Sequence, residues 1–262
     1  MTNVLFTGER LSPGSQLFGV DLARHRAAYM HAILCARGET LLDLGCGIGY
    51  GTAELADALA PRVRVFGLDR VRPAKTWRRA NARYLSADLN GIPLAPRSFD
   101  TITSFQVIEH LEDPTRYLEA IAQLLRADGR AFITTPNLLT SDKVNPWHVH
   151  EYEATELRQT LLAHFGEVEM LGVGIGPAVA GYFEERLTRI RKIMRLDPLG
   201  LRNLLPATAI DWLFATFARV VRRGIQQGGG LPNATIDDFP IGPAAPGDID
   251  LLAVCSAPRT KE

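Results

Sequence analysis

Short apolar runs alternate with amphipathic stretches at regular spacing between residues 40 and 137. This rhythm is typical of successive strand–helix units, which build a parallel sheet covered by helices. It predicts strands at Leu41–Leu44, Val63–Leu68, Arg83–Leu85, Phe99–Phe105 and Arg130–Thr135. Crossover helices are expected at Thr52–Leu59 and Pro114–Leu125, and Asp128-Gly129 is interpreted as the stop signal of the second helix.

Further elements are expected on both sides of this region. Asp21–Cys35 and Glu153–Phe165 have the polar and apolar pattern of helices, and Val168–Val173 is expected to be a strand. Asp250–Cys255 is expected to return to the sheet as its last strand. The predicted fold class is α/β: a Rossmann-like, seven-stranded, mostly parallel sheet with helices on both faces and a helical insert before the last strand.

The region from 181 to 247 breaks the rhythm and is predicted to be that insert. Its part from 181 to 226 holds nine Lys and Arg against four Asp and Glu. An apolar stripe at helical spacing follows Ile210, Leu213, Phe214, Phe217, Val220 and Val221. We therefore expect a catalytic domain over 1–180, a helical insert or cap over 181–247, and the final strand of the catalytic sheet within 248–262.

Charge and composition restrict the class of protein. The chain has 262 residues, with 29 Lys and Arg against 29 Asp and Glu, and 46% are hydrophobic. That apolar fraction can form a core, and zero net charge gives no global field to attract a polyanion. No basic patch is evident in the first 180 residues, so no nucleic-acid partner is expected.

The three cysteines are an odd number without close spacing, which argues against a disulfide framework. The first residues include Glu9 and Arg10, and no run of about 18 apolar residues occurs. A cytoplasmic protein that neither is secreted nor spans a membrane is expected.

The run Leu41-Leu-Asp-Leu-Gly-Cys-Gly-Ile-Gly-Tyr-Gly51 places a glycine-rich turn between a predicted strand and a predicted helix. Gly45, Gly47 and Gly49 permit backbone torsions and a close ligand approach that a β-carbon would forbid. Their spacing is not that of a dinucleotide site, because the third glycine would have to occupy position 50. Asp43, just before the turn, would repel a phosphate but attract an ammonium or sulfonium group.

Two more acids follow strands further along the chain. Asp69 lies about twenty residues beyond the glycines, where nucleotide-binding α/β folds hold ribose hydroxyls. Asp88, followed by Leu89, could accept a hydrogen bond from an adenine amino group. The next strand runs into Ser104-Phe-Gln-Val-Ile-Glu-His110.

These motifs, in this order, resemble those of class I S-adenosylmethionine-dependent methyltransferases over roughly residues 21–173 and the last strand. Asp43 and the three glycines match the first motif of that family, and Asp69 and Asp88 match its ribose and adenine acids. The segment from Phe105 to Leu111 matches the one beneath the methyl donor. The resemblance implies S-adenosylmethionine as cofactor, bound by Asp43, Gly45, Cys46, Gly47, Gly49, Asp69, Asp88, Leu89 and Gln106. Asp128 and Arg130 depart from the usual Leu-Lys-Pro-Gly-Gly.

Methyl transfer from a sulfonium is an in-line displacement, and a hydroxyl acceptor must also lose its proton. Histidine suits that task near neutral pH. His110 follows a strand at the carboxyl end of the sheet, and His148 lies in the polar loop Asn145-Pro-Trp-His148. We expect His110 or His148 to act as base or orienting group, with Glu109 fixing the imidazole.

The order Glu109-His110 and then His148 also looks like metal-dependent small-RNA 2′-O-methyltransferases, whose Glu-x-x-Glu-His motif and later histidine bind a divalent cation. Ubiquinone-type O-methyltransferases carry a similar motif. Here Gln106 replaces the first glutamate, and an amide supplies no negative charge. A divalent metal is therefore the less favoured alternative.

The overall likeness is to bacterial methyltransferases associated with cell-surface polysaccharide and glycolipid assembly. It implies a sugar, glycolipid or similar small acceptor methylated on oxygen. The alternatives are a polyketide or quinone-type acceptor and a non-catalytic cofactor-binding scaffold. The insert could be a cap, a dimer contact or a helix that meets a membrane surface, and its 181–226 part is where peripheral membrane contact is expected.

Overall fold

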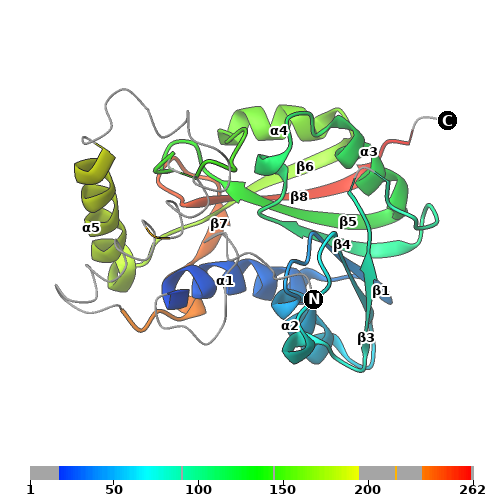
Figure 1. Ribbon diagram of the computed structural model, residues 1–262. Helices are drawn as coiled ribbons and strands as arrows, with labels where there is room; N and C mark the ends of the chain where they lie inside the picture. Colours follow the sequence, from blue (N-terminus) through cyan, green and yellow to red (C-terminus); the bar gives the residue numbers. More distant parts are fainter. Residues whose placement is uncertain (1–17, 90, 144, 195–215, 217–231, 261–262) are drawn as a thin grey trace. The chain divides into compact units, whose positions relative to one another are not determined.

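Figure 1 shows the computed structural model, which describes residues 18–89, 91–143, 145–194, 216 and 232–260. The chain divides into two compact units. The sheet unit comprises His25–Ser141, His148–Gly174 and Ile241–Glu262. The smaller unit comprises Met1–Arg24, Asp142–Trp147 and Ile175–Pro240.

The sheet unit contains one eight-stranded sheet in the order β3-β2-β1-β4-β5-β8-β6-β7. Its strands are β1 (Thr40–Leu44), β2 (Arg64–Asp69), β3 (Ala82–Ser86), β4 (Phe99–Phe105), β5 (Leu125–Pro136), β6 (Phe165–Val173), β7 (Ile241–Pro243) and β8 (Asp250–Pro258). The first five strands pair in parallel, whereas β8 is antiparallel to β5 and β6, and β7 is antiparallel to β6. The sheet is thus mixed but mostly parallel, as the strand–helix rhythm predicts.

Two details differ from the sequence-based prediction. The sheet has eight strands rather than seven, because Ile241–Pro243 pairs with the end of β6 although it was expected to belong to the insert. Asp128-Gly129 does not stop a helix. Helix α3 already ends at Leu124, and these two residues lie within β5, where the pairing with β4 jumps from Leu125 to Arg130.

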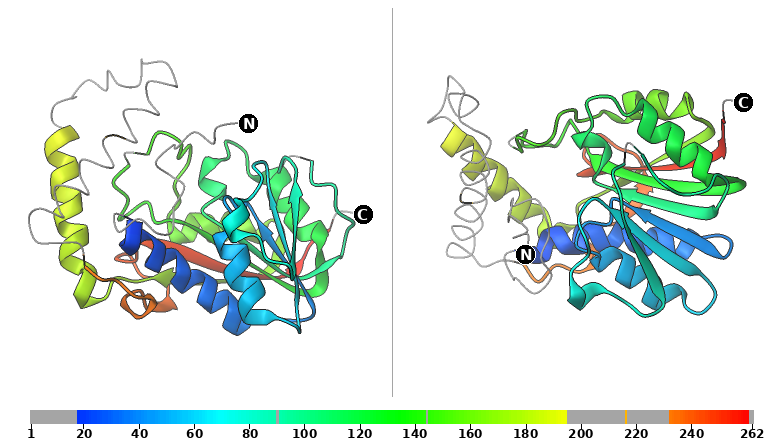
Figure 2. Two further views of the ribbon diagram at one scale, coloured as in Figure 1. Left: turned by 60° about the horizontal axis from the view of Figure 1, so that its bottom comes forward. Right: turned by 45° about the vertical axis from the view of Figure 1, so that its right-hand side comes forward.

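Helices cover both faces of this sheet (Figures 1 and 2). Helix α2 (Tyr50–Leu59) and the part of α1 (Gly19–Cys35) from His25 onward lie on one face. Helices α3 (Thr115–Leu124) and α4 (Ala154–Leu162) lie on the other. The central strands β1 and β4 are almost wholly buried, as strands covered on both faces must be, although they include polar residues such as Asp43 and Thr103. Their carboxyl ends meet at one sheet edge, where ligands bind in folds of this kind.

In the smaller unit, helix α5 (Pro177–Met194) carries a partly buried ion-pair cluster. Arg186 contacts Asp21 at 3.3 Å and Asp142 at 3.1 Å. The short helix η5 (Ile236–Asp238) is fixed by a capping box in which Thr235 and Asp238 bond reciprocally. The predicted apolar stripe at Ile210–Val221 lies outside the described residues, apart from position 216. In the described part of the chain, no helix combines the length and apolar character needed to cross a bilayer.

Candidate active site

The glycine-rich turn between β1 and α2 requires its glycines. Gly45, Gly47 and Gly49 have φ values of 81°, 54° and 91°, the left-handed region in which side chains are strained. A β-carbon at Gly45 would overlap Val107, whereas one at Gly47 would meet nothing within 4 Å. The turn is therefore tightly packed at Gly45 and open at Gly47, which fits a close approach by a ligand there.

Asp43 lies beneath this turn and is 1% exposed. Thr52 donates its hydroxyl to Asp43 Oδ2 at 2.6 Å, Thr103 donates to Oδ1 at 2.9 Å, and Tyr29 donates at 3.3 Å. Burial raises the pKa of Asp43 to about 6, and the hydroxyl bonds counteract part of that rise. The contact of Asp43 with the amino-acid end of a cofactor stays a prediction.

Asp69, at the end of β2, links the turn to the next connection. Gly47 N donates to Asp69 Oδ2 at 2.8 Å, and Val71 N donates to Oδ1 at 2.7 Å. Each carboxylate oxygen has a second lone pair, so Asp69 can still accept hydrogen bonds from a vicinal diol. These contacts place the predicted ribose acid directly beside the open glycine.

The other predicted cofactor residues occupy different environments. Asp88 is exposed after β3, and Leu89 is partly buried against the core. Gln106 follows β4 with φ 56°, a conformation that is uncommon for a residue other than glycine. Cys46 is buried, and burial raises the pKa of its thiol, so it is a small neutral residue within the turn.

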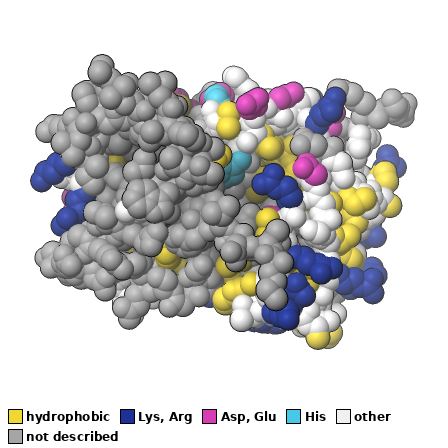
Figure 3. All heavy atoms as spheres, viewed as in Figure 1, with side chains coloured by type: hydrophobic (Ala, Val, Ile, Leu, Met, Phe, Trp, Pro, Cys, Tyr) yellow, Lys and Arg dark blue, Asp and Glu magenta, His cyan; other side chains and the backbone are white. Residues whose placement is uncertain are grey.

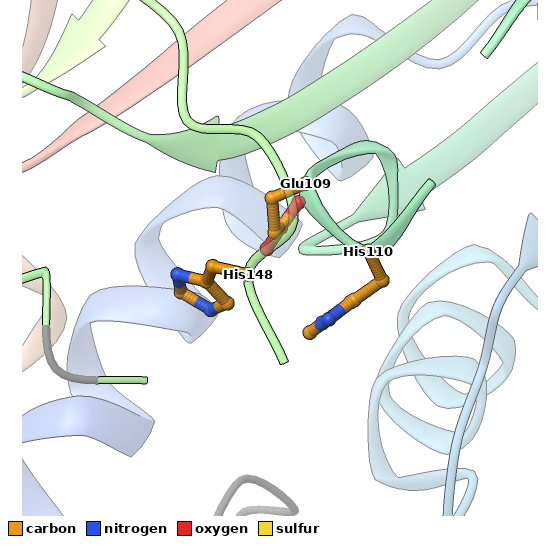
Figure 4. A group of neighbouring side chains, drawn as sticks. All are labelled: Glu109, His110 and His148. Atoms are coloured by element: carbon orange, nitrogen blue, oxygen red, sulfur yellow. The ribbon is translucent and has the colours of Figure 1, made fainter. Parts of the chain in front are cut away.

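Glu109, His110 and His148 come together at the carboxyl edge of the sheet (Figure 4). Glu109 and His110 belong to the short helix η3 (Ile108–His110), and His148 lies in the loop that crosses it. The backbone carbonyl of Glu109 accepts hydrogen bonds from Val149 N at 2.8 Å and His150 N at 3.1 Å. This backbone contact brings the predicted histidines together, and their ring centroids are 5.3 Å apart.

A second glutamate, which the sequence analysis gave no role, holds His148. Glu151 Oε1 lies 2.6 Å from His148 Nδ1, and Ser141 donates its hydroxyl to the same oxygen at 2.8 Å. The carboxylate that bonds the His148 ring is thus Glu151 rather than Glu109. The spacing His148-x-x-Glu151 was visible in the sequence, but only the fold shows that the two side chains meet.

Glu109 is fully buried, and neither of its carboxylate oxygens accepts a hydrogen bond from the residues that the structure describes. Burial raises its pKa to about 8, so the carboxyl is mostly protonated at neutral pH. An unpaired polar group of this kind is costly inside a protein, so Glu109 stays a predicted site residue.

The same three residues offer ligand atoms that all lie within 4.8 Å of one another. One carboxylate and two imidazoles suit a divalent transition-metal ion. Gln106 is not part of this group, and its side-chain amide lies 3.5 Å from Thr134 Oγ1. The group therefore offers three metal ligands, whereas a Glu-x-x-Glu-His motif with a later histidine would offer four.

The remaining histidines are placed elsewhere. The Nδ1 atom of His25 lies 3.2 Å from the Tyr50 hydroxyl, and His31 is in α1 beside Cys35. His150 and Glu156 form an exposed pair with a 2.7 Å contact. His164 lies between α4 and β6. None of these four is part of the Glu109 group.

The chain belongs to the methyltransferase-domain family, whose model matches residues 18–217. It carries a class I S-adenosylmethionine-dependent methyltransferase domain, and the glycine turn and Asp69 fit that cofactor.

A probable S-adenosylmethionine-dependent methyltransferase of Mycolicibacterium smegmatis is 31% identical over 96% of this chain and 95% of its own length. One of Mycobacterium tuberculosis is 34% identical, and the match spans 65% of each protein. A ubiquinone biosynthesis O-methyltransferase of Neisseria meningitidis is 33% identical over 41% of this chain and 47% of its own length.

Among solved structures, phosphoethanolamine N-methyltransferase 2 of Haemonchus contortus, in complex with S-adenosylmethionine, superposes with a TM-score of 0.53. The match covers 93% of this chain and 57% of that one, at 18% identity. At this identity the likeness concerns the fold alone.

We predict that Asp43 makes stability depend on pH. An ordinary aspartate ionises near pH 4, whereas folded Asp43 keeps its proton up to about pH 6. The pKa of Asp43 is higher in the folded than in the unfolded protein. The contribution of Asp43 to the free energy of unfolding is therefore greatest below about pH 4, and it falls by on the order of 3 kcal/mol as the pH rises to about 6. Urea unfolding of the wild type and Asp43→Asn across this range measures the effect. A stability difference between the two proteins that is constant with pH would contradict it.

We also predict that Asp69→Ala weakens S-adenosylmethionine binding at least tenfold, because two charge-assisted hydrogen bonds to the ribose are lost. Isothermal titration calorimetry measures the affinity. Asp69 also accepts hydrogen bonds from the backbone of Gly47 and Val71. The matched control is Asp57→Ala, which removes an exposed acid that pairs with Arg79. Unchanged affinity of the Asp69 variant would refute the ribose assignment.

Proposed function

We propose that the protein transfers the methyl group of S-adenosylmethionine to a hydroxyl of a sugar, glycolipid or similar small acceptor. The observation that carries this proposal is the pairing of His148 with Glu151 at 2.6 Å, beside Glu109 and His110. A histidine held in this way is the group that removes a proton from a hydroxyl near neutral pH.

The reaction needs one bond formed and one broken. The acceptor oxygen attacks the methyl carbon, the carbon–sulfur bond breaks, and S-adenosylhomocysteine leaves as a neutral thioether. The hydroxyl proton passes to His148 Nε2, because Nδ1–H donates to Glu151. Glu151 keeps the ring in the tautomer whose Nε2 lone pair is available, and it stabilises the imidazolium that forms.

Glu109 and His110 complete the site in this proposal. Glu109, buried and mostly protonated, can donate a hydrogen bond to the acceptor or to His110. A divalent ion held by Glu109, His110 and His148 is the less favoured alternative, and it would polarise the acceptor hydroxyl as a Lewis acid. The cofactor itself would be held by Asp43, the glycine turn and Asp69, with Asp88 and Leu89 on the adenine side and Gln106 in the segment beneath the methyl donor.

A quinone-type phenol is the second candidate acceptor, favoured by the relationship to the ubiquinone O-methyltransferase. A phenol is far more acidic than a sugar hydroxyl and depends less on a base. The non-catalytic scaffold is disfavoured, because a protein that only binds the cofactor has no use for a paired histidine beside the sheet edge.

The test of the acceptor class is a panel of sugar nucleotides, glycolipids and phenols incubated with the protein and S-adenosylmethionine, and read by mass spectrometry. We expect a gain of one methyl group on a sugar-containing acceptor and none on phenols. Methylation of phenols alone would favour the second candidate, and no methylation of any compound would favour the scaffold.

We predict that His148→Ala lowers kcat by about 100-fold or more, as expected for the loss of a general base. Glu151→Gln should lower kcat less and shift the pH–rate profile to lower pH, because an amide does not stabilise the imidazolium and the pKa of His148 therefore falls. The affinity for S-adenosylmethionine should not change in either variant. Steady-state assays over a range of pH and calorimetry measure these effects.

The chain provides a matched control in the exposed pair of His150 and Glu156. His150→Ala and Glu156→Gln should leave kcat and the pH profile unchanged. If His148→Ala also keeps the full rate, positioning alone carries the reaction. Treatment with a chelator should not alter turnover. A loss of turnover on chelation would favour the metal alternative.

A further inference from the structure

Positive charge is concentrated in one part of the sheet unit. Residues 60–97 contain nine Lys and Arg and only two acids, Asp69 and Asp88. Because the whole chain is neutral, the remaining residues carry seven more acids than bases. The nine basic residues of 60–97 lie within the first 180 residues. The statement that no basic patch is evident there was therefore wrong.

The basic side chains face solvent. Arg62, Arg64, Arg70, Arg72, Lys75 and Arg83, which we call the basic edge, are all exposed. Among the described residues, none of the six forms an ion pair, in contrast to Arg79, which pairs with Asp57 at 2.8 Å. Charges left unpaired in this way remain available to an external partner.

The fold explains why these charges gather. The connection from β2 to β3 forms only the three-residue helix η2 (Lys75–Trp77), and no helix is described between β3 and β4. The register pairs Phe66 with Arg83. Since side chains two apart share a strand face, Arg64 and Arg83 lie on the same face as Phe66. That face of the outermost strands is therefore not covered by a long helix.

Apolar side chains accompany the basic edge. Phe66, Leu85, Ile92 and Leu94 are only partly buried against the core. Pro93, Ala95 and Pro96 of the β3–β4 connection are exposed. Figure 3 shows Lys and Arg side chains gathered at the lower right of the view, with hydrophobic side chains between and above them.

We propose that the basic edge and the adjoining β3–β4 connection form a docking surface for a membrane rich in anionic lipids. Lipid phosphates would lie against the unpaired arginines, and the partly exposed apolar side chains would enter the headgroup boundary. This location differs from the 181–226 segment, where membrane contact was expected. It stands independently of the acceptor proposed above.

A bilayer fits this surface better than a nucleic acid. Nucleic-acid interfaces are polar, and bases need donors, acceptors or exposed aromatic rings. The aromatic side chains near the basic edge, Trp77 and Tyr84, are half-buried. A mixture of arginines and aliphatic residues instead matches the two layers of a membrane surface, charged headgroups and acyl chains.

The test is co-sedimentation of the full chain with vesicles of phosphatidylcholine, with and without phosphatidylglycerol. We expect sedimentation with the anionic vesicles only, and release at about 1 M salt, at which charges are screened within about 3 Å. Equal partitioning to neutral vesicles, or no partitioning to either kind, overturns the proposal.

Neutralising three charges locates the surface. Arg64→Gln, Lys75→Gln and Arg83→Gln combined should weaken the partition coefficient on the order of 100-fold, at about fivefold for each charge. The control variant removes the same charge from exposed positions elsewhere, by Arg37→Gln, Arg116→Gln and Arg158→Gln. It should weaken the partition coefficient several-fold less than the first variant does.

Calorimetry with S-adenosylmethionine checks that both triple variants are folded. Equal losses in the two variants would overturn the assignment to the basic edge. A short labelled RNA duplex that displaces the protein from vesicles at equal phosphate concentration would overturn the choice of a membrane. The salt dependence of the unaltered chain tests the proposal even if a variant fails to fold.

Discussion

The buried carboxylate of Asp43 is the contact on which the cofactor side of the sheet unit depends. Its hydroxyl partners, Tyr29, Thr52 and Thr103, come from α1, α2 and β4, while Asp43 itself belongs to β1. A charge taken out of water must be satisfied by hydrogen bonds, and this requirement ties four elements to one point. The glycine turn begins two residues later, so its geometry is anchored by the same network.

The two glutamates near His148 show how environment separates residues of one type. Glu151 accepts bonds from the ring and from Ser141, whereas the oxygens of Glu109 accept none from described residues. The Glu151 carboxylate is therefore suited to stabilise a positive charge on His148. The Glu109 carboxyl is suited to donate a hydrogen bond or to bind a ligand. Both are positioned by a single loop crossing, in which the Glu109 carbonyl accepts two backbone amides.

Sequence patterns predicted what depends on local burial and missed what depends on distant pairing. Phe99–Phe105 was predicted with the bounds of β4 from the alternation of strand and helix patterns, and the strand is almost wholly buried although it contains Asp, Thr and Ser. Ile241–Pro243 contains glycine and proline and becomes a strand only by pairing with β6. Likewise, the partner of His148 and the clustering of the arginines follow from chain crossings and missing helices. No local periodicity records those features.

The outermost position of β3 also bears on whether two copies could associate edge to edge. An outermost strand presents unpaired backbone groups on which a second copy could extend the sheet. Arg83 is exposed within β3, and Arg64 follows the same face on the neighbouring strand. Two copies approaching edge to edge would bring these like charges together, so the repulsion acts as a gatekeeper against aggregation during and after folding.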